Sequence, residues 1–351
     1  MTEFVTPPAL EPGDEVAVVA PSSGGAHDFP HVLELALERL RGVFDLRPVV
    51  YPTARQGNDF LEVHPEARAA DVHTAFRDPD ISGVFATIGG SDQLRVLRHL
   101  DADTLREHPT RFYGMSDNSN LGLFLWRAGV VSYNGAQLLN ELGVRGELPE
   151  YTERYARRAF FEDALGELEA SERWTDEPTD WWPSGEVPDT PPDYEANPGW
   201  SWHGGEERAT GRLWGGCLSV VDWHLASDRY LPDPARLDGA VLAVEIAEDL
   251  PRADDVAASM LCMGERGLLE RFAAVLVGRV PGRSFLEQPP ADERAAYRRR
   301  VREAVVEKVG RYNPDAPVVT GLDWGHTTPT APLPLGSVVE VDPRERSVAF
   351  R

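Results

Sequence analysis

Three polar residues, far apart in the chain, are of the types that carry out nucleophilic catalysis: Ser116, Glu245 and His326. Ser116 stands between an apolar stretch and a helical pattern, so a tight turn would present its hydroxyl. Glu245 directly follows the apolar residues 241–244, and His326 stands in a loop of Gly, Thr and Pro. A serine that attacks, a histidine that takes its proton and a carboxylate that orients the histidine form a complete set for cutting an acyl bond. The sequence therefore indicates one catalytic site, provided that the fold brings the three together.

The surroundings of Ser116 add groups suited to stabilising a negatively charged oxygen. A helix is expected over residues 119–128, and its first turn offers free backbone N–H groups and the positive end of the helix dipole. The Asp117 N–H is one candidate donor. The second is the Gly90 N–H, in the glycine pair that follows the apolar residues 83–88. Each feature also has a purely structural interpretation, as a helix cap, a tight turn or a surface-loop histidine.

Further carboxylates follow Glu245, at Glu248, Asp249, Asp254 and Asp255. Such a run is typical of a solvated face. Glu248 is close enough to Glu245 along the chain to enter the same cleft, and we therefore predict that it contributes to substrate binding.

The first 165 residues alternate between short apolar runs and helical patterns, which predicts a parallel sheet with helices on both faces. The expected strands are residues 15–20, 46–51, 83–88 and 111–115, and the expected helices are residues 31–41, 66–76, 92–100 and 119–128. Ligands bind at the carboxyl ends of the strands in such sheets. Three loops of small or polar residues fall there, at residues 21–25, 89–92 and 116–118. One crevice is therefore expected to gather them.

A second domain is expected over residues 209–351, after an N-terminal α/β domain over residues 1–165 that contains the nucleophile. Its expected strands are residues 211–214, 240–244 and 272–278, its helices are residues 218–226, 254–265 and 293–312, and residues 337–341 and 347–350 form a closing hairpin. The predicted fold class is α/β, with a parallel-sheet N-terminal domain and a smaller C-terminal domain that carries the Glu and His.

The connector between these domains, residues 166–208, has a composition of its own. It is rich in Pro, Asp and Glu, and it begins a stretch, residues 174–223, that holds seven of the nine tryptophans. Disordered linkers are poor in aromatic residues. We expect either an ordered loop that faces the substrate or a linker that its tryptophans pin to both domains.

Composition limits the partners. The net charge is −23, which argues against nucleic acid and anionic membranes. Lys308 is the only lysine among 35 basic residues, a pattern expected of a protein from concentrated salt or from a genome of high GC content. No apolar run suits a membrane span and no signal peptide is recognisable, so a cytoplasmic protein is expected. The two cysteines have no metal-ligand spacing and no phosphate-binding glycine motif is present, so we expect no metal or cofactor.

Taken in order, these motifs resemble the LD-carboxypeptidase family of serine peptidases over nearly the whole chain. The matching stretches are residues 13–23, 88–90, 114–119, 211–218, 244–245 and 325–329. Within the family, residues 172–176 and 197–200 look like the branch that includes the microcin C self-immunity peptidase. That branch cleaves an amide between an aminoacyl group and a nucleotide-like moiety, whereas the murein branch removes a terminal D-residue from a cell-wall tetrapeptide.

The resemblance implies Ser116 as nucleophile, His326 as general base and acid, and Glu245 as its orienting partner. It implies an oxyanion hole from the backbone N–H groups of Gly90 and Asp117. It matches Trp174 and Trp181 to the family's adenine-stacking aromatics, and Cys217 replaces a usual Asn. The implied fold is an α/β sandwich joined to a smaller β-rich domain, with the triad across the interdomain cleft, usually in a homodimer.

Three functions remain open on the sequence. The leading hypothesis is a serine hydrolase that cuts an amide in a small peptide or aminoacyl-nucleotide through an acyl-enzyme. The second is an LD-carboxypeptidase that acts on a murein tetrapeptide, with the tryptophans serving only structure. The third, from another class, is a small-ligand-binding protein that has lost catalysis.

Overall fold

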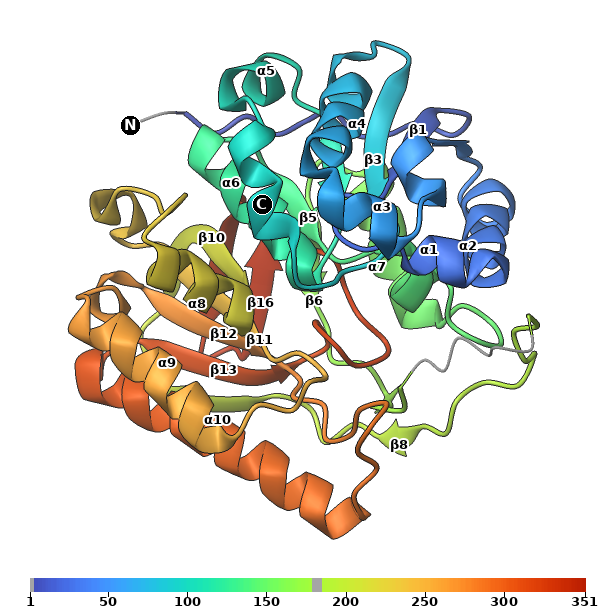
Figure 1. Ribbon diagram of the computed structural model, residues 1–351. Coiled ribbons are helices and arrows are strands. Elements are labelled where there is room, and N and C mark those ends of the chain that lie inside the picture. Colours follow the sequence, from blue (N-terminus) through green and yellow to red (C-terminus); the bar gives the residue numbers. More distant parts are fainter. Residues whose placement is uncertain (1–2, 179–184) are drawn as a thin grey trace.

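The computed structural model describes residues 3–178 and 185–351, which form two halves that each contain one large sheet (Figure 1). The first sheet has six strands in the order β14-β5-β4-β3-β1-β2. They are β1 (Glu15–Val19), β2 (Arg47–Val50), β3 (Ile81–Ala86), β4 (Arg111–Tyr113), β5 (Ser132–Asn134) and β14 (Leu333–Leu335). All neighbours are parallel except β14 and β5. The predicted parallel sheet is confirmed.

Helices cover both faces of this sheet, because its strands are apolar on both sides. In β1, Val16 and Val18 join one buried cluster and Ala17 and Val19 join the other, as the alternation of side chains along a strand requires. The helices of this half are α1 (Gly25–Asp28), α2 (Pro30–Gly42), α3 (Asn58–Val63), α4 (Pro65–Arg77), α5 (Ala102–Glu107), α6 (Ser119–Ala128) and α7 (Glu150–Phe161). Apolar residues of α2 belong to the first cluster and those of α4 and α5 to the second.

One predicted helix of this half is wrong. Residues 92–100 form two short 3₁₀ turns, η2 (Gln93–Arg95) and η3 (Leu97–His99), instead of an α-helix. The Gln93 side chain turns inward, where its Nε2 donates to Asn118 Oδ1 at 2.7 Å and its Oε1 accepts from Leu121 N at 2.9 Å. These tertiary hydrogen bonds override the helical periodicity. The other short turns are η1 (Pro52–Arg55), η4 (Ser116–Asn118), η5 (Leu138–Leu142, a π-helix), η6 (Pro234–Leu237) and η7 (Leu269–Arg271).

The second sheet has eight strands in the order β6-β16-β15-β10-β11-β12-β13-β9. They are β6 (Gly166–Leu168), β9 (Ser201–Gly204), β10 (Ala209–Cys217), β11 (Val241–Glu245), β12 (Ala274–Gly278), β13 (Pro317–Leu322), β15 (Val338–Asp342) and β16 (Ser347–Phe350). The four strands β10 to β13 are parallel, and the outer ones are antiparallel. Its helices are α8 (Leu218–Ser227), α9 (Ala253–Glu265) and α10 (Ala291–Tyr312). The α/β fold with a strand-rich second half and the closing hairpin β15–β16 are confirmed.

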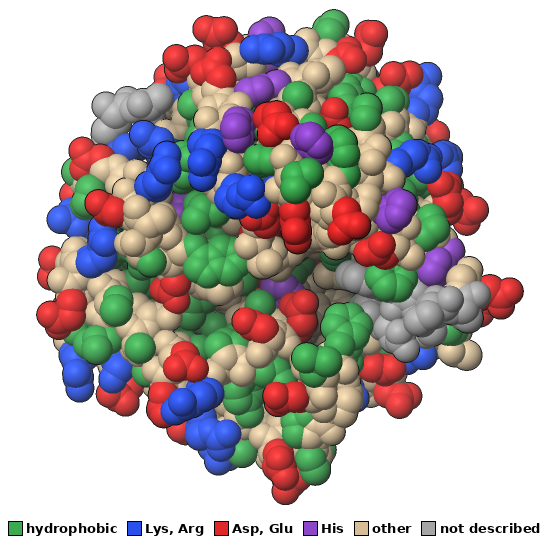
Figure 2. All heavy atoms as spheres, viewed as in Figure 1, with side chains coloured by type: hydrophobic (Ala, Val, Ile, Leu, Met, Phe, Trp, Pro, Cys, Tyr) green, Lys and Arg blue, Asp and Glu red, His purple; other side chains and the backbone are tan. Residues whose placement is uncertain are grey.

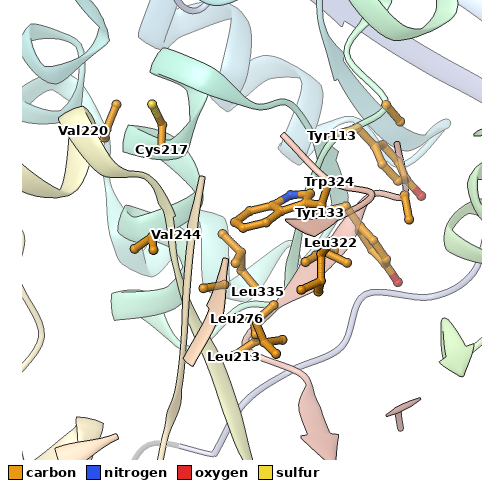
Figure 3. Close-up of a cluster of buried hydrophobic side chains, with 14 of the residues drawn as sticks. Tyr113, Tyr133, Leu213, Cys217, Val220, Val244, Leu276, Leu322, Trp324 and Leu335 are labelled. Atoms are coloured by element: carbon orange, nitrogen blue, oxygen red, sulfur yellow. The ribbon is translucent and has the colours of Figure 1, made fainter. Parts of the chain in front are cut away.

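The two halves exchange strands. β14 comes from the C-terminal part of the chain but pairs with β5, and β6 begins the connector, directly after the first half, but pairs with β16. Buried tryptophans join the halves as well: Trp126 Nε1 donates to Leu213 O at 2.9 Å, and Trp324 Nε1 donates to both oxygens of Asn134 at 3.1 Å. Figure 3 shows Trp324 and Leu335 among core side chains of both halves. One continuous core therefore fixes the halves relative to each other.

The described part of the connector is ordered. β7 (Arg173–Trp174) pairs with β8 (Glu195–Ala196), and the buried carboxylate of Asp323 anchors the segment to the end of β13. Asp323 accepts hydrogen bonds from Ser171 Oγ at 2.7 Å and Trp200 Nε1 at 3.1 Å. Trp200 thus pins the connector. Among the same described residues, no helix has the length and apolarity needed to cross a bilayer.

Candidate active site

Ser116 follows β4 on a tight turn, and its side chain lines a cavity. Its φ is +60°, a value that a non-glycine residue adopts only under strain, as is common at functional sites. Gly89 makes room for it, because a Cβ on Gly89 would lie 2.8 Å from Ser116 Cβ and 2.9 Å from its Oγ. Asp117 N faces the same gap, 3.4 Å from that Cβ position. The serine turn therefore requires a glycine at position 89.

The Asp117 side chain fixes this turn through hydrogen bonds. Its buried carboxylate accepts hydrogen bonds from Asp92 N at 3.0 Å, Gln93 N at 2.9 Å, Asn120 Nδ2 at 2.8 Å and the Ser22 hydroxyl. Burial raises the pKa of Asp117, and these hydrogen bonds oppose the rise. The carboxylate is fully used in positioning, so only the backbone N–H of Asp117 remains as a candidate oxyanion donor.

His326 and Glu245 meet at the carboxyl ends of β13 and β11. The His326 Nδ1–H donates to Glu245 Oε2 at 2.6 Å, and their side chains are 4% and 0% exposed. Gly325 permits this approach, because it has a φ of +96° and a Cβ there would lie 2.8 Å from Glu245 Cβ. The hydrogen bond fixes the tautomer that leaves Nε2 for a reacting hydroxyl.

Glu248 occupies the other side of the imidazole. Its Oε2 lies 3.0 Å from His326 Nε2, an ion-pair contact without good hydrogen-bond geometry. Burial on its own would lower the pKa of His326, but the two carboxylates outweigh burial and raise that pKa well above its ordinary value. For Glu248, burial acts to raise the pKa, and the charge of His326 outweighs it and lowers the pKa. Both ring nitrogens of His326 therefore face a carboxylate oxygen, an arrangement that favours the protonated imidazole.

A cavity of about 340 Å³ gathers most of the predicted residues. Ser116, Gly90, Glu248 and His326 line it, and Glu245 reaches it through His326. Figure 2 shows this face hollowed near its middle, with histidine atoms inside the hollow and acidic side chains around it. The structure thus brings the candidate nucleophile and base to one cavity between the two halves.

The two predicted stacking tryptophans are placed differently. Trp174 is buried between the guanidinium groups of Arg279 and Arg298, each 4.8 Å from its ring centroid, and it does not line the cavity. Trp181 lies outside the described residues. The aromatic ring that the described chain does bring to the cavity is Phe285.

Sequence reasoning missed the cavity wall formed by Asp176, Arg283 and Phe285. Asp176 accepts from Gly282 N at 2.8 Å and Arg283 Nε at 2.7 Å, and it pairs with Arg298 at 2.5 Å. A signal was available, because the loop with Arg283 and Phe285 follows β12 and the carboxyl ends of parallel strands are where ligands bind. Asp176 carried no such signal.

Two further kinds of reactive group, a cluster of metal ligands and a thiol, have a defined status in the described part of the chain. Across residues 3–178 and 185–351, no group of three or more His, Cys, Asp or Glu side chains could hold a metal ion. Cys217 pairs in register with Glu245, but burial and, next, the Glu245 charge raise the pKa of its thiol well above the usual range. A protonated, buried thiol is a poor nucleophile.

Comparison with known proteins agrees with this architecture. Residues 16–135 match the LD-carboxypeptidase N-terminal domain, and residues 210–341 match the LD-carboxypeptidase C-terminal domain. The chain is 26% identical to a probable murein peptide carboxypeptidase of Bacillus subtilis, over 98% of this chain and 93% of that protein. It is 23% identical to the microcin C7 self-immunity protein MccF of Escherichia coli, over 81% and 77%.

A crystal structure of an MccF-like protein from Streptococcus pneumoniae in complex with AMP superposes with a TM-score of 0.84. It is 27% identical and covers 96% of this chain and 98% of that one. Both halves of the fold and both family domains agree, so this chain belongs to the LD-carboxypeptidase family of serine peptidases.

Proposed function

We propose that this protein is a serine amidohydrolase that cuts an amide in a small peptide or an aminoacyl-nucleotide, with Ser116, His326 and Glu245 as its catalytic residues. The observation that carries the proposal is the His326–Glu245 hydrogen bond of 2.6 Å at the wall of the cavity that Ser116 enters from a strained turn. This arrangement supports the assignment of Ser116, His326 and Glu245 as nucleophile, base and orienting carboxylate of an acyl transfer.

The reaction follows from these positions. Ser116 Oγ attacks the scissile carbonyl while His326 Nε2 takes its proton, and Glu245 holds Nδ1–H and stabilises the imidazolium. The Gly90 and Asp117 N–H groups donate to the oxyanion of the tetrahedral intermediate. His326 returns the proton to the leaving nitrogen, which departs and leaves an acyl-serine ester. Water then attacks the ester with His326 again as base, which releases the acid and restores Ser116.

Two observations support an aminoacyl-nucleotide as substrate. The MccF-like protein that superposes on this chain was solved with AMP, and the chain is also related to the self-immunity protein MccF. Phe285 and Arg283 at the cavity supply an aromatic face and a cation, which suit a base and a phosphate or its mimic. The homodimer that the family resemblance implies is part of the same proposal, and sedimentation velocity tests it.

The alternative substrate is a murein tetrapeptide, and the Bacillus relative named a probable murein peptide carboxypeptidase favours it. The burial of Trp174 outside the cavity also fits this alternative, because it leaves that tryptophan a structural role.

The test is mass spectrometry of the purified enzyme, at low and high salt, with alanyl sulfamoyl adenosine and with a murein tetrapeptide. Release of alanine from the first supports the nucleotide-linked substrate, and loss of the terminal D-alanine from the second supports the murein peptide. Ser116→Ala should lower kcat by about 10⁴-fold or more with folding intact. Tight binding without turnover, and without labelling of Ser116 by an active-site phosphonate, would instead indicate a binding protein.

A further inference from the structure

The carboxylates that line the cavity differ in how they are neutralised. Asp176 is paired with arginines, Glu177 pairs with Arg145, and Glu141 accepts a hydrogen bond from Thr330 Oγ1 at 2.7 Å. Among the described residues, Glu248 has only His326 as a charged partner, and its side chain is 42% exposed. Glu248 is therefore the cavity carboxylate whose neutralisation depends on the protonation state of the base.

This partnership conflicts with the reaction. His326 Nε2 is the atom that must accept the Ser116 proton, yet in the unliganded protein it faces Glu248 Oε2 at 3.0 Å and has no hydrogen-bond partner in the described chain. When His326 becomes neutral to act as base, it no longer neutralises Glu248. Glu248 is then left without a counter-charge in the described chain, and a cationic group of a ligand that enters the cavity can pair with it.

We infer that Glu248 is a specificity residue that binds an ammonium group carried by the substrate residue that supplies the scissile carbonyl. The inference rests on the proposed function. The ammonium replaces the imidazolium as the partner of Glu248, the Nε2 proton leaves to the solvent, and Nδ1–H stays on Glu245. Charge is conserved, because one cation enters the site and one proton departs, and Nε2 becomes free to accept the Ser116 proton.

The other acidic groups near His326 do not fill this role. Glu245 is bound to Nδ1 and is fully buried. Burial raises the pKa of Glu141, whose carboxylate already accepts hydrogen bonds from Thr330 Oγ1 and Gln137 N. Burial and then the charge of Glu248 raise the pKa of Asp249, which does not line the cavity. Of these groups, Glu248 lines the cavity, carries a negative charge and has His326 as its only charged partner among the described residues.

The test compares matched substrates that differ only in the ammonium group. Alanyl sulfamoyl adenosine and its N-acetyl form are one pair, and a lysine-containing murein tetrapeptide with and without acetylation of that lysine is the other. The enzyme and Glu248→Gln are assayed on whichever pair is hydrolysed, across pH 5.5–9. Asp249→Asn is the control, because it removes a neighbouring carboxylate outside the cavity, and Ser116→Ala is the activity blank.

We expect the wild type to prefer the free amine by about tenfold or more in kcat/KM. Glu248→Gln should lose this preference mainly through KM, whereas Asp249→Asn should keep it. Glu248→Gln should also move the acid limb of kcat/KM to lower pH and raise activity on the acetylated substrate at pH 6, because His326 then loses one of its two carboxylate partners. If Glu248 had only a structural role, Glu248→Gln would lower kcat/KM for the free and the acetylated substrate alike.

Equal kcat/KM values for the free and acetylated substrates in the wild type would overturn the inference while leaving the proposed function standing. A preference that survives in Glu248→Gln would overturn it as well. No turnover of either pair, with no phosphonate labelling of Ser116, would contradict the proposed function itself and the inference with it.

Discussion

The two halves of the site treat their carboxylates in opposite ways. On the serine side, Asp117 accepts four hydrogen bonds from the chain around it. On the histidine side, Glu245 Oε1 has no partner among the described residues and Glu248 meets only the imidazole. The first carboxylate is built into the fold, whereas the other two keep hydrogen-bonding capacity in reserve. On the serine side the fold itself positions the candidate nucleophile, whereas on the proposed mechanism the protonation of His326 responds to what enters the cavity.

The largest effect that would test this contrast is on Glu245. Glu245→Gln should lower kcat by about 10³–10⁴-fold, because the amide neither stabilises the imidazolium nor enforces the tautomer. Steady-state kinetics gives the effect, and an unchanged thermal melt controls for folding. A loss below tenfold would remove Glu245 from the catalytic machinery.

Asp117 should matter mainly for stability. Asp117→Asn replaces an acceptor of four hydrogen bonds by a group with two donors of its own, and we expect the free energy of unfolding to fall by about 3–5 kcal/mol. Urea denaturation measures the change. Asp254→Asn is the matched control, since its side chain is 85% exposed and the same substitution should stay within about 0.5 kcal/mol. Equal effects at the two positions would contradict a positioning role for Asp117.

The hydrogen bond between His224 and Asn120, which joins the two halves, should make the stability of the protein depend on pH. Its Nε2–H donates to Asn120 Oδ1 at 2.8 Å, and burial lowers the pKa of His224 to about 4. Between about pH 6.5 and pH 4 the histidine is protonated in the unfolded chain but neutral in the folded protein. The free energy of unfolding therefore falls as the pH drops through this range, by about 3 kcal/mol in total.

His224→Gln keeps a donor to Asn120 and should flatten this part of the pH dependence, measured by denaturation at steps between pH 7 and 4. The wild-type protein, measured at the same pH steps, is the reference. An equal slope in the wild type and in His224→Gln would mean that His224 is not the group that titrates.

The smallest expected effect concerns Trp174. Trp174→Phe keeps an aromatic ring between Arg279 and Arg298, so we expect a loss of about 1–2 kcal/mol in stability and the same kcat/KM on both substrate classes. Thermal unfolding and kinetics together decide. A loss of activity confined to nucleotide-linked substrates would restore the stacking role that the sequence suggested.

Much of the fold could be predicted because it depends on local patterns. The helix expected at residues 119–128 is α6, and the strand expected before Glu245 is β11. The candidate residues of the site could be named for the same reason, since Ser116 and His326 stand in turns with glycine nearby. The contact of Glu248 with Nε2 could not, because it depends on how a loop folds over the cavity. β6 and β14 could not be predicted either, because strands of three residues are too short to show an alternating pattern of apolar and polar residues, and their partners lie in the other half.

The exchanged strands also decide where this chain can be recombined with its relatives. A crossover within the connector would unite β5 of one parent with β14 of the other, and β6 of the first with β16 of the second. Chimaeras joined there would therefore contain two strand pairs, β5–β14 and β6–β16, whose members come from different parents, even if each half is well packed internally. Carrying β6 and β14 along with their pairing partners is the rule that a library of hybrid enzymes on this scaffold would have to follow.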